Sequence, residues 1–362
     1  MTTTKSRIVG TALAGLAVAW AVFRVAPAPL PDLPRFVAAL GNWRDRNPDP
    51  DYDHLRENLL FQWLFEPAAS LGVNSYLLQW VIGVVLVVGG LAWLYRRNVS
   101  PQWRGTALRL AILSPVAAIM VGFFGSYDPV TMGVALLLLA AWMAQRRIGV
   151  VAFGALLGLQ HFGQALAMVV ALGLTTAALS EDGPRSAVRL TGQALGGVLL
   201  GKGIALTVLW VASGSPLGSR VPPTSEVIAT SNAVVTTVNF FPALLLSLFA
   251  GAWAIVVAAF IVRSRRGRFL LLAAAVVVSY SLVFTDQTRI FVLLAFPSLA
   301  MLTIFVLQRF EGNRAAIRGI EALAWIITPI LLWTDSDGVG RVQYLGALDA
   351  QIMAWQQVLG WG

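Results

Sequence analysis

Apolar residues in this chain come in blocks of about twenty, the length that spans a bilayer as a helix, and short polar connectors separate the blocks. The pattern predicts an all-α fold: a polytopic transmembrane helical bundle of about 11 spans. The chain is expected to form a single integral membrane domain over residues 1–362. The predicted spans are 8–24, 75–94, 106–124, 130–144, 148–160, 163–179, 190–213, 240–262, 269–284, 290–308 and 317–333.

The window 148–179 is too long for a single span. As one straight helix it would be about 48 Å long, against a hydrocarbon core of roughly 30 Å. The polar sequence Gln160-His161-Phe162-Gly163-Gln164 interrupts the window near its middle. We therefore expect two short helices that meet at a polar turn and form a hairpin.

The distribution of charge predicts the orientation of the spans. With a cytoplasmic N-terminus, the inner side holds 17 of the 26 basic residues, and the outer side holds 13 of the 17 acidic ones. This bias is the positive-inside rule, and it predicts an N-in, C-out topology. The later loops keep the alternation only if 148–179 is a hairpin. Since inner loops account for the net charge of +9, no nucleic-acid partner is expected.

Composition agrees with a membrane protein. Charged residues make up 12% of the chain, about half the usual share of a soluble domain, and the mean hydropathy is +0.74. Cysteine is absent, which excludes disulfides, thiolate metal sites and cysteine nucleophiles. The first segment is expected to be a retained anchor rather than a cleaved signal peptide, because Arg24 interrupts the cleavage context.

The three longest segments outside the membrane are all expected on the outer side: a first loop (25–74), a second loop (214–239) and the C-terminal tail (334–362). Within the first loop, one helical face carries Leu55, Leu59, Trp63 and Leu64, with Phe61 and Phe65 nearby. This pattern predicts an amphipathic helix at the membrane surface. Residues 33–44 are expected to form a shorter one.

Unusual polar residues gather on the predicted outer face. Ionisable residues at membrane depth are costly and usually functional, so function is expected at this face, toward the periplasm or exterior of an inner or plasma membrane. Lys202, by contrast, lies about midway along a predicted span. The outer-face candidates are Asp51, Asp53, His54, Tyr127, Asp128, His161, Asp286 and Arg289.

Each candidate also has a purely structural interpretation. Acidic residues in a long loop are usually solvated, and Asp128 before Pro129 is ordinary helix-start chemistry. Asp286 and Arg289 are spaced to pair locally with each other. Either histidine is equally compatible with a hydrogen-bonded structural role, and the long stem of Lys202 reaches toward head groups.

Taken together, the candidates favour chemistry on a lipid-linked phosphate. Lys202 and Arg289 suit an anionic head group. The carboxylates Asp51, Asp53 and Asp128 suit removal of a proton from a hydroxyl. These parts fit transfer of a group from a lipid phosphate carrier to an acceptor alcohol.

In these features the chain resembles the C-type (GT-C) glycosyltransferases, integral membrane enzymes that use polyprenyl-phosphate sugars. The resemblance rests on Asp51-Tyr52-Asp53 in a long first outer loop, the surface helices around it, Asp128 after the third span, and about eleven N-in spans. It implies an inverting glycosyltransferase that moves a sugar, hexosyl or pentosyl, from a polyprenyl-phosphate carrier to a glycan or lipid acceptor. Larger family members have a soluble outer domain, and no such domain is expected in this chain.

The resemblance also implies roles for residues. An acid of the first outer loop is the family's general base, so Asp53, or else Asp51, would take the acceptor proton. Arg289 and Lys202 would offset charge on the departing phosphate. His54 or His161 would orient the acceptor or bind phosphate. Some relatives use a divalent metal, but no ligand spacing in this chain argues for a metal site or any other cofactor.

Two other functions fit part of the pattern. A surface-polysaccharide polymerase or ligase would act on a polyprenyl-diphosphate-linked oligosaccharide with similar outer-face residues. A transporter or scramblase would show interrupted helices at matching positions of two halves. The interrupted window 148–179 is the one hint of the latter, with no counterpart in the second half.

Overall fold

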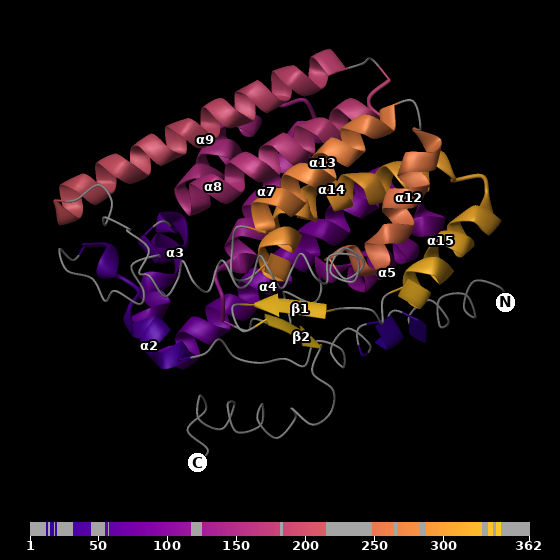
Figure 1. Cartoon of the computed structure of the whole chain (residues 1–362). Helices are drawn as coiled ribbons and strands as arrows, with labels where there is room; N and C mark the ends of the chain where they lie inside the picture. Colours follow the sequence, from indigo (N-terminus) through magenta and orange to yellow (C-terminus); the bar gives the residue numbers. More distant parts are fainter. Residues whose placement is uncertain are drawn as a thin grey trace.

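The chain forms a bundle of helices together with a short two-stranded antiparallel ribbon, as seen in a computed structural model (Figure 1). The structure describes residues 12–13, 15–17, 19, 32–44, 55–56, 58–116, 125–181, 184–214, 248–263, 266–282, 287–327, 332–335 and 338–341. Its elements are α2 (Leu33–Ala38), η1 (Asn42–Arg44), α3 (Leu59–Ala69), α4 (Val73–Asn98), η3 (Pro101–Trp103), α5 (Arg104–Leu113), α7 (Asp128–Met143), α8 (Arg147–Leu179), α9 (Pro184–Ser213), η4 (Ala250–Ala252), α12 (Trp253–Val262), α13 (Gly267–Ser281), α14 (Gln287–Arg309), α15 (Arg314–Ile327), β1 (Leu332–Asp335) and β2 (Gly338–Arg341).

Helices of membrane-spanning character dominate the described part of the chain. Four are long and apolar enough to cross a membrane: Val73–Asn98, Phe162–Leu179, Pro184–Ser213 and Arg289–Arg309. Four shorter apolar helices accompany them: Asp128–Met143, Arg147–Gln160, Ala250–Val262 and Gly267–Ser281. The helical membrane-protein fold is therefore supported, while eleven spans and the N-in, C-out orientation stay predictions.

Two predicted spans need correction. The span at 106–124 is interrupted, because α5 ends at Leu113 and Ser114 is extended (φ −74°, ψ 163°). Pro115 follows, and proline disfavours a helical conformation in the residue before it. The span at 317–333 ends early, since α15 stops at Ile327 and Leu332–Asp335 pairs with Gly338–Arg341 as a β-ribbon. That ribbon was not predicted.

Other predictions fall outside the described residues. These include most of the first span and almost all of the loop at 214–239. Most of the C-terminal tail at 334–362 does so too, apart from the ribbon. Their structure and sidedness stay predictions.

The predicted hairpin at 148–179 is confirmed by packing. His161 has non-helical backbone angles (φ −164°, ψ 98°) and divides α8 into two limbs, Arg147–Gln160 and Phe162–Leu179. Along the first limb, Gly154 and then Gly158 pack against Ala194 and then Val198 of α9, so this limb runs parallel to α9. Along the second limb, however, Gly173 lies back against Thr191. The second limb therefore returns antiparallel to the first.

A side-chain hydrogen bond at the base of the hairpin supports the antiparallel arrangement of its two limbs. Trp142 Nε1, at the end of α7, donates to Thr176 Oγ1 over 3.0 Å. Since α7 leads directly into the first limb at Arg147, the end of the second limb lies beside the start of the first. Figure 1 shows α9 along the outer edge of the bundle, next to α8.

The helix ends divide into two groups at opposite ends of the bundle. The first is called the arginine-rich end, and side-chain hydrogen bonds join its helix ends and loops. The donor–acceptor pairs are Gln308 to Asn98 O, Trp103 to Glu311 O, Arg189 to Gln145, Arg263 to Leu179 O and Arg266 to Ser180 O. The second, here called the Asp128 end, holds the start of α7, the hairpin turn of α8 and the start of α14. The described loops that were predicted to be basic and inner thus share one end.

Helices in the first loop are confirmed, whereas their position at the membrane surface stays a prediction. Trp63 and Leu64 are 38% and 47% exposed, whereas Phe61 and Gln62 are buried. Gln62 tolerates burial because both ends of its amide are bonded. Its Oε1 accepts from Gly41 N–H, and its Nε2 donates to Leu55 O over 2.6 Å.

A partly buried ion pair links α5 to α15. The Glu321 carboxylate accepts from Arg109 Nε and, over 3.1 Å, from Arg109 Nη2, while Thr106 Oγ1 donates to it over 3.2 Å. The pair is only 11% and 14% exposed. The two charged groups are therefore largely removed from water, and each is stabilised by the other.

We expect Glu321→Ala to destabilise the protein by about 1–3 kcal/mol, because it leaves the Arg109 guanidinium unpaired in a mostly apolar setting. Thermal unfolding in detergent, followed by tryptophan fluorescence, measures the effect. Glu311→Ala is the matched control, since Glu311 is exposed and its backbone carbonyl makes its contact with Trp103. Equal losses in the two variants would show that the Arg109 pair does not stabilise the fold.

Candidate functional site

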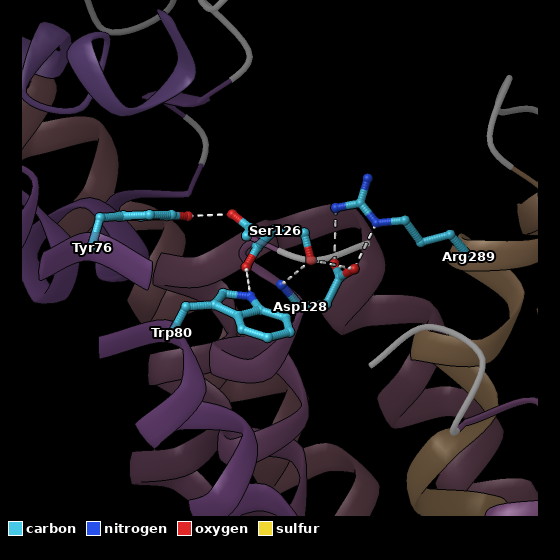
Figure 2. A network of polar contacts seen from close by, with 6 residues as sticks. Tyr76, Trp80, Ser126, Asp128 and Arg289 are labelled. Atoms are coloured by element: carbon cyan, nitrogen blue, oxygen red, sulfur yellow. Dashed lines mark hydrogen bonds and ion pairs between the residues drawn. The ribbon is translucent and has the colours of Figure 1, made fainter. Parts of the chain in front are cut away.

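The turn before α7 is fastened to α4 by two aromatic donors. Tyr76 OH donates to Gly125 O, and Trp80 Nε1 donates to Ser126 O over 2.8 Å (Figure 2). Both donors lie on one face of α4, four residues apart. Gly125 has a positive φ of 96°, and a Cβ there would come within 2.8 Å of Leu33. The turn is therefore held in one conformation.

This turn presents Asp128 to Arg289 of α14. Arg289 Nε donates to Asp128 Oδ2 over 2.7 Å, and Arg289 Nη2 donates to Oδ1 over 2.9 Å. Ser126 Oγ also donates to Oδ2, over 2.9 Å. The Asp128 side chain is 1% exposed and that of Arg289 12%. A bidentate pair of this kind is geometrically specific and strong for a hydrogen-bonded contact.

The guanidinium also lies against an aromatic ring. Its central carbon is 4.7 Å from the centroid of Tyr127. Tyr127 in turn packs 5.8 Å from the ring of Phe61 in α3. In Figure 2 one edge of the Arg289 fork faces Asp128, and the third nitrogen points away from it. Arg289 is thus oriented from two sides, with one edge directed elsewhere.

The hairpin turn of α8 lies at the same end. Phe61 N–H donates to Gln160 Oε1 over 2.9 Å, and Gln164 N–H donates to His161 Nδ1 over 3.4 Å. If His161 is neutral, its proton is therefore on Nε2. Gln160 and Gln164 are 0% and 1% exposed. Among the described residues, Gln160 Nε2 and both amide atoms of Gln164 have no hydrogen-bond partner.

Lys202 lies beside this turn rather than beside the ion pair. Its Nζ is 5.6 Å from the ring centroid of Phe162, a cation–π distance, and the residue is half-buried. The flanking residue Gly201 packs against the backbone of Ala155 in the first limb of α8. The described contacts do not join Lys202 to Arg289.

An apolar groove of about 510 Å³ opens next to the ion pair, between α4 and α7. One end is lined by Leu64, Gln79 and Pro129, the residue that directly follows Asp128. From there it runs along both helices to Trp93 and Ala140. Such a groove suits a hydrocarbon chain whose polar end lies near Asp128 and Arg289.

The predicted site residues therefore divide into three groups. Tyr127, Asp128 and Arg289 are brought into direct contact, although the sequence suggested Asp286 as the partner of Arg289. His161 and Lys202 lie at the neighbouring hairpin turn. Asp51, Asp53, His54 and Asp286 lie outside the described residues.

Tyr76, Trp80 and Ser126 were not predicted as part of the site. Aromatic residues at a span's end are so common in membrane proteins that the sequence alone does not mark them as contacts of a turn. The described residues contain no group of three or more His, Cys, Asp or Glu that could hold a metal ion.

Comparison with known proteins adds no assignment, since no family model, curated protein or solved structure matches this chain.

Proposed function

We propose that the protein is an integral membrane glycosyltransferase that moves a sugar from a polyprenyl-phosphate carrier to an acceptor hydroxyl. The observation that carries the proposal is the position of Arg289. Asp128 and Tyr127 hold its guanidinium, and Pro129, which directly follows Asp128, lines one end of an apolar groove. An anionic group attached to a long hydrocarbon is the ligand chemistry that this combination fits.

In this proposal Arg289 binds the carrier phosphate from the position in which Asp128 and Tyr127 hold it. Arginine suits this task because its planar donors match phosphate oxygens. The polyprenyl chain then enters the groove beside Pro129. Lys202 and His161, at the adjoining hairpin turn, are proposed to contact the sugar-phosphate or the acceptor.

Asp128 takes a different role from the one the residue pattern suggested. Both of its oxygens accept hydrogen bonds from Arg289, and one accepts a further bond from Ser126. This bidentate contact fixes the position of the Arg289 guanidinium. We therefore assign Asp128 to positioning Arg289, and the general base to Asp53, with Asp51 as the alternative.

The proposed reaction is a single displacement. Asp53 takes the proton of the acceptor hydroxyl while the hydroxyl oxygen forms a bond to the anomeric carbon. The bond from that carbon to the phosphate oxygen breaks, and polyprenyl monophosphate leaves with the electron pair. Because attack comes from the face opposite the phosphate, the anomeric configuration inverts. Arg289 offsets the charge that grows on the departing phosphate.

Binding and transfer are tested separately. In proteoliposomes supplied with a polyprenyl-phosphate sugar, Asp53→Asn is expected to lower transfer by ~10²–10⁴-fold, the usual contribution of a general base. Native mass spectrometry should show undiminished binding of polyprenyl monophosphate to this variant, because the carboxylate acts on the acceptor. Arg289→Gln, in contrast, should lose carrier binding as well as transfer.

Arg189→Gln is the control for Arg289→Gln, since Arg189 contacts Gln145 at the arginine-rich end. Thermal unfolding of each variant separates loss of function from loss of fold. Unchanged carrier binding in folded Arg289→Gln would remove Arg289 from the phosphate site. Selective retention of a diphosphate-linked oligosaccharide by the wild-type protein would instead favour a polymerase or ligase.

A further inference from the structure

The groove between α4 and α7 continues beyond its apolar part. Trp93, Leu94, Leu137 and Ala140 line both the groove described above and a second hollow of about 990 Å³. The second hollow extends to the start of α8 at Arg147, at the arginine-rich end. The two hollows therefore form one continuous groove along the helices.

Basic residues line the far part of this groove. Arg97 at the end of α4, and Arg146 and Arg147 before and at the start of α8, all contribute to its wall. No acidic residue lines it. The structure shows no acidic partner for these three arginines within its described part, and Arg97 lies 5.6 Å from the ring centroid of Trp93. The start of α8 adds the positive end of a helix dipole to this charge.

The dimensions suit one lipid tail. From Arg97 to Leu86, eleven residues back along α4, the helix rises about 16 Å. Half of the hydrocarbon core of a bilayer, the depth of one leaflet, is about 15 Å. The wall over this distance is apolar, with Gly90 and Ala140 leaving room between larger side chains.

We propose that this part of the groove is a specific site for an anionic phospholipid. The phosphate lies among Arg97, Arg146 and Arg147, and one acyl chain lies along Trp93 and Leu137 toward Leu86. The charge complementarity at one end and the apolar wall at the other select this occupant over a zwitterionic lipid or a free anion. The phosphate lies at the opposite end of the bundle from Asp128 and Arg289, and the acyl chain ends at Leu86, so the part of the groove beside Pro129 remains for the carrier chain.

The test compares lipid retention in native mass spectra of protein taken from nanodiscs of equimolar phosphatidylglycerol and phosphatidylcholine. The wild-type protein is expected to retain phosphatidylglycerol selectively. Because each basic residue near a membrane surface favours anionic lipid by ~5-fold, the triple variant Arg97→Gln/Arg146→Gln/Arg147→Gln should lose selectivity of order 100-fold. The matched control is Arg268→Gln/Arg314→Gln/Arg318→Gln, which removes the same charge from exposed positions away from the groove.

A second variant tests the apolar wall. Ala140→Trp fills the groove without changing charge and should also release phosphatidylglycerol, which a merely electrostatic surface would retain. Thermal unfolding confirms that each variant is folded. Equal retention in the two triple variants, or unchanged retention in folded Ala140→Trp, would overturn the proposal. So would displacement of phosphatidylglycerol by equimolar polyprenyl monophosphate, which would assign the whole groove to the carrier.

Discussion

Asp128→Ala is expected to lower the free energy of unfolding by about 3–5 kcal/mol, the usual cost of breaking a buried ion pair by removing one partner. The substitution leaves the Arg289 guanidinium, 12% exposed, without the carboxylate that it contacts at 2.7 and 2.9 Å. It also removes the acceptor of Ser126 Oγ. Thermal and denaturant unfolding in one detergent would measure the loss.

A double-mutant cycle separates the pair from its surroundings. Arg289→Met should be as damaging as Asp128→Ala, because it leaves the buried carboxylate unpaired. Asp128→Leu/Arg289→Met should recover most of the stability, since apolar replacement of both partners is often neutral. The control is the more exposed Arg44–Glu66 pair, where Arg44→Met should cost less than about 1 kcal/mol. Additive effects of the two changes at Asp128 and Arg289 would mean that the ion pair is not formed.

Gly158→Leu is expected to destabilise the protein by about 3 kcal/mol or more, because it forces the α8 hairpin away from α9. A Cβ at Gly158 would overlap the carbonyl oxygen of Val198, and one at Gly154 would lie 2.6 Å from that of Ala194. On α9, Gly197 and Gly201 pack against the backbone of the first limb in the same way. The contacted atoms belong to the helix backbone, which cannot move aside as the end of a flexible side chain can.

These four glycines form two facing Gly-x-x-x-Gly sequences, which allow close approach of helices in a membrane. Gly203→Leu is the matched control, since Gly203 lies on the partner helix α9 and a Cβ there meets nothing within 4 Å. Both substitutions change helix propensity in the same way. Beyond that shared change, chemical-denaturant unfolding should show a lower free energy of unfolding in Gly158→Leu alone. If both lost the same stability, the close packing of α8 on α9 would be refuted.

Much of the helical arrangement was predictable from sequence, because membrane spans follow from local hydropathy and length. The hairpin in α8 is an example: a straight helix over 147–179 would be too long, and a polar cluster interrupts it at His161. The ends of the helices were less predictable where a proline interrupts an apolar segment. The apolar character at 106–124 continues past Ser114, yet Pro115 ends the helix there.

The candidate site was predictable in its residues but not in its contacts. Asp128 and Arg289 were both noticed, since charge next to an apolar span is costly. Their pairing was not, because 161 residues separate them and Asp286 offered a local partner. The α4 donors Tyr76 and Trp80 were missed because their acceptors, backbone carbonyls of the turn before α7, lie 49 and 46 residues away in the chain.

The sequence by itself thus determined that the chain is helical and membrane-like, where it doubles back in α8, and which charges stand out at helix ends. These features depend on residues close together in the chain and on their transfer between water and lipid. Only the tertiary structure decided that Asp128 pairs with Arg289, that Gly158 contacts α9, and that a groove joins Pro129 to Arg147. Those depend on how distant helices pack, which local hydropathy does not specify.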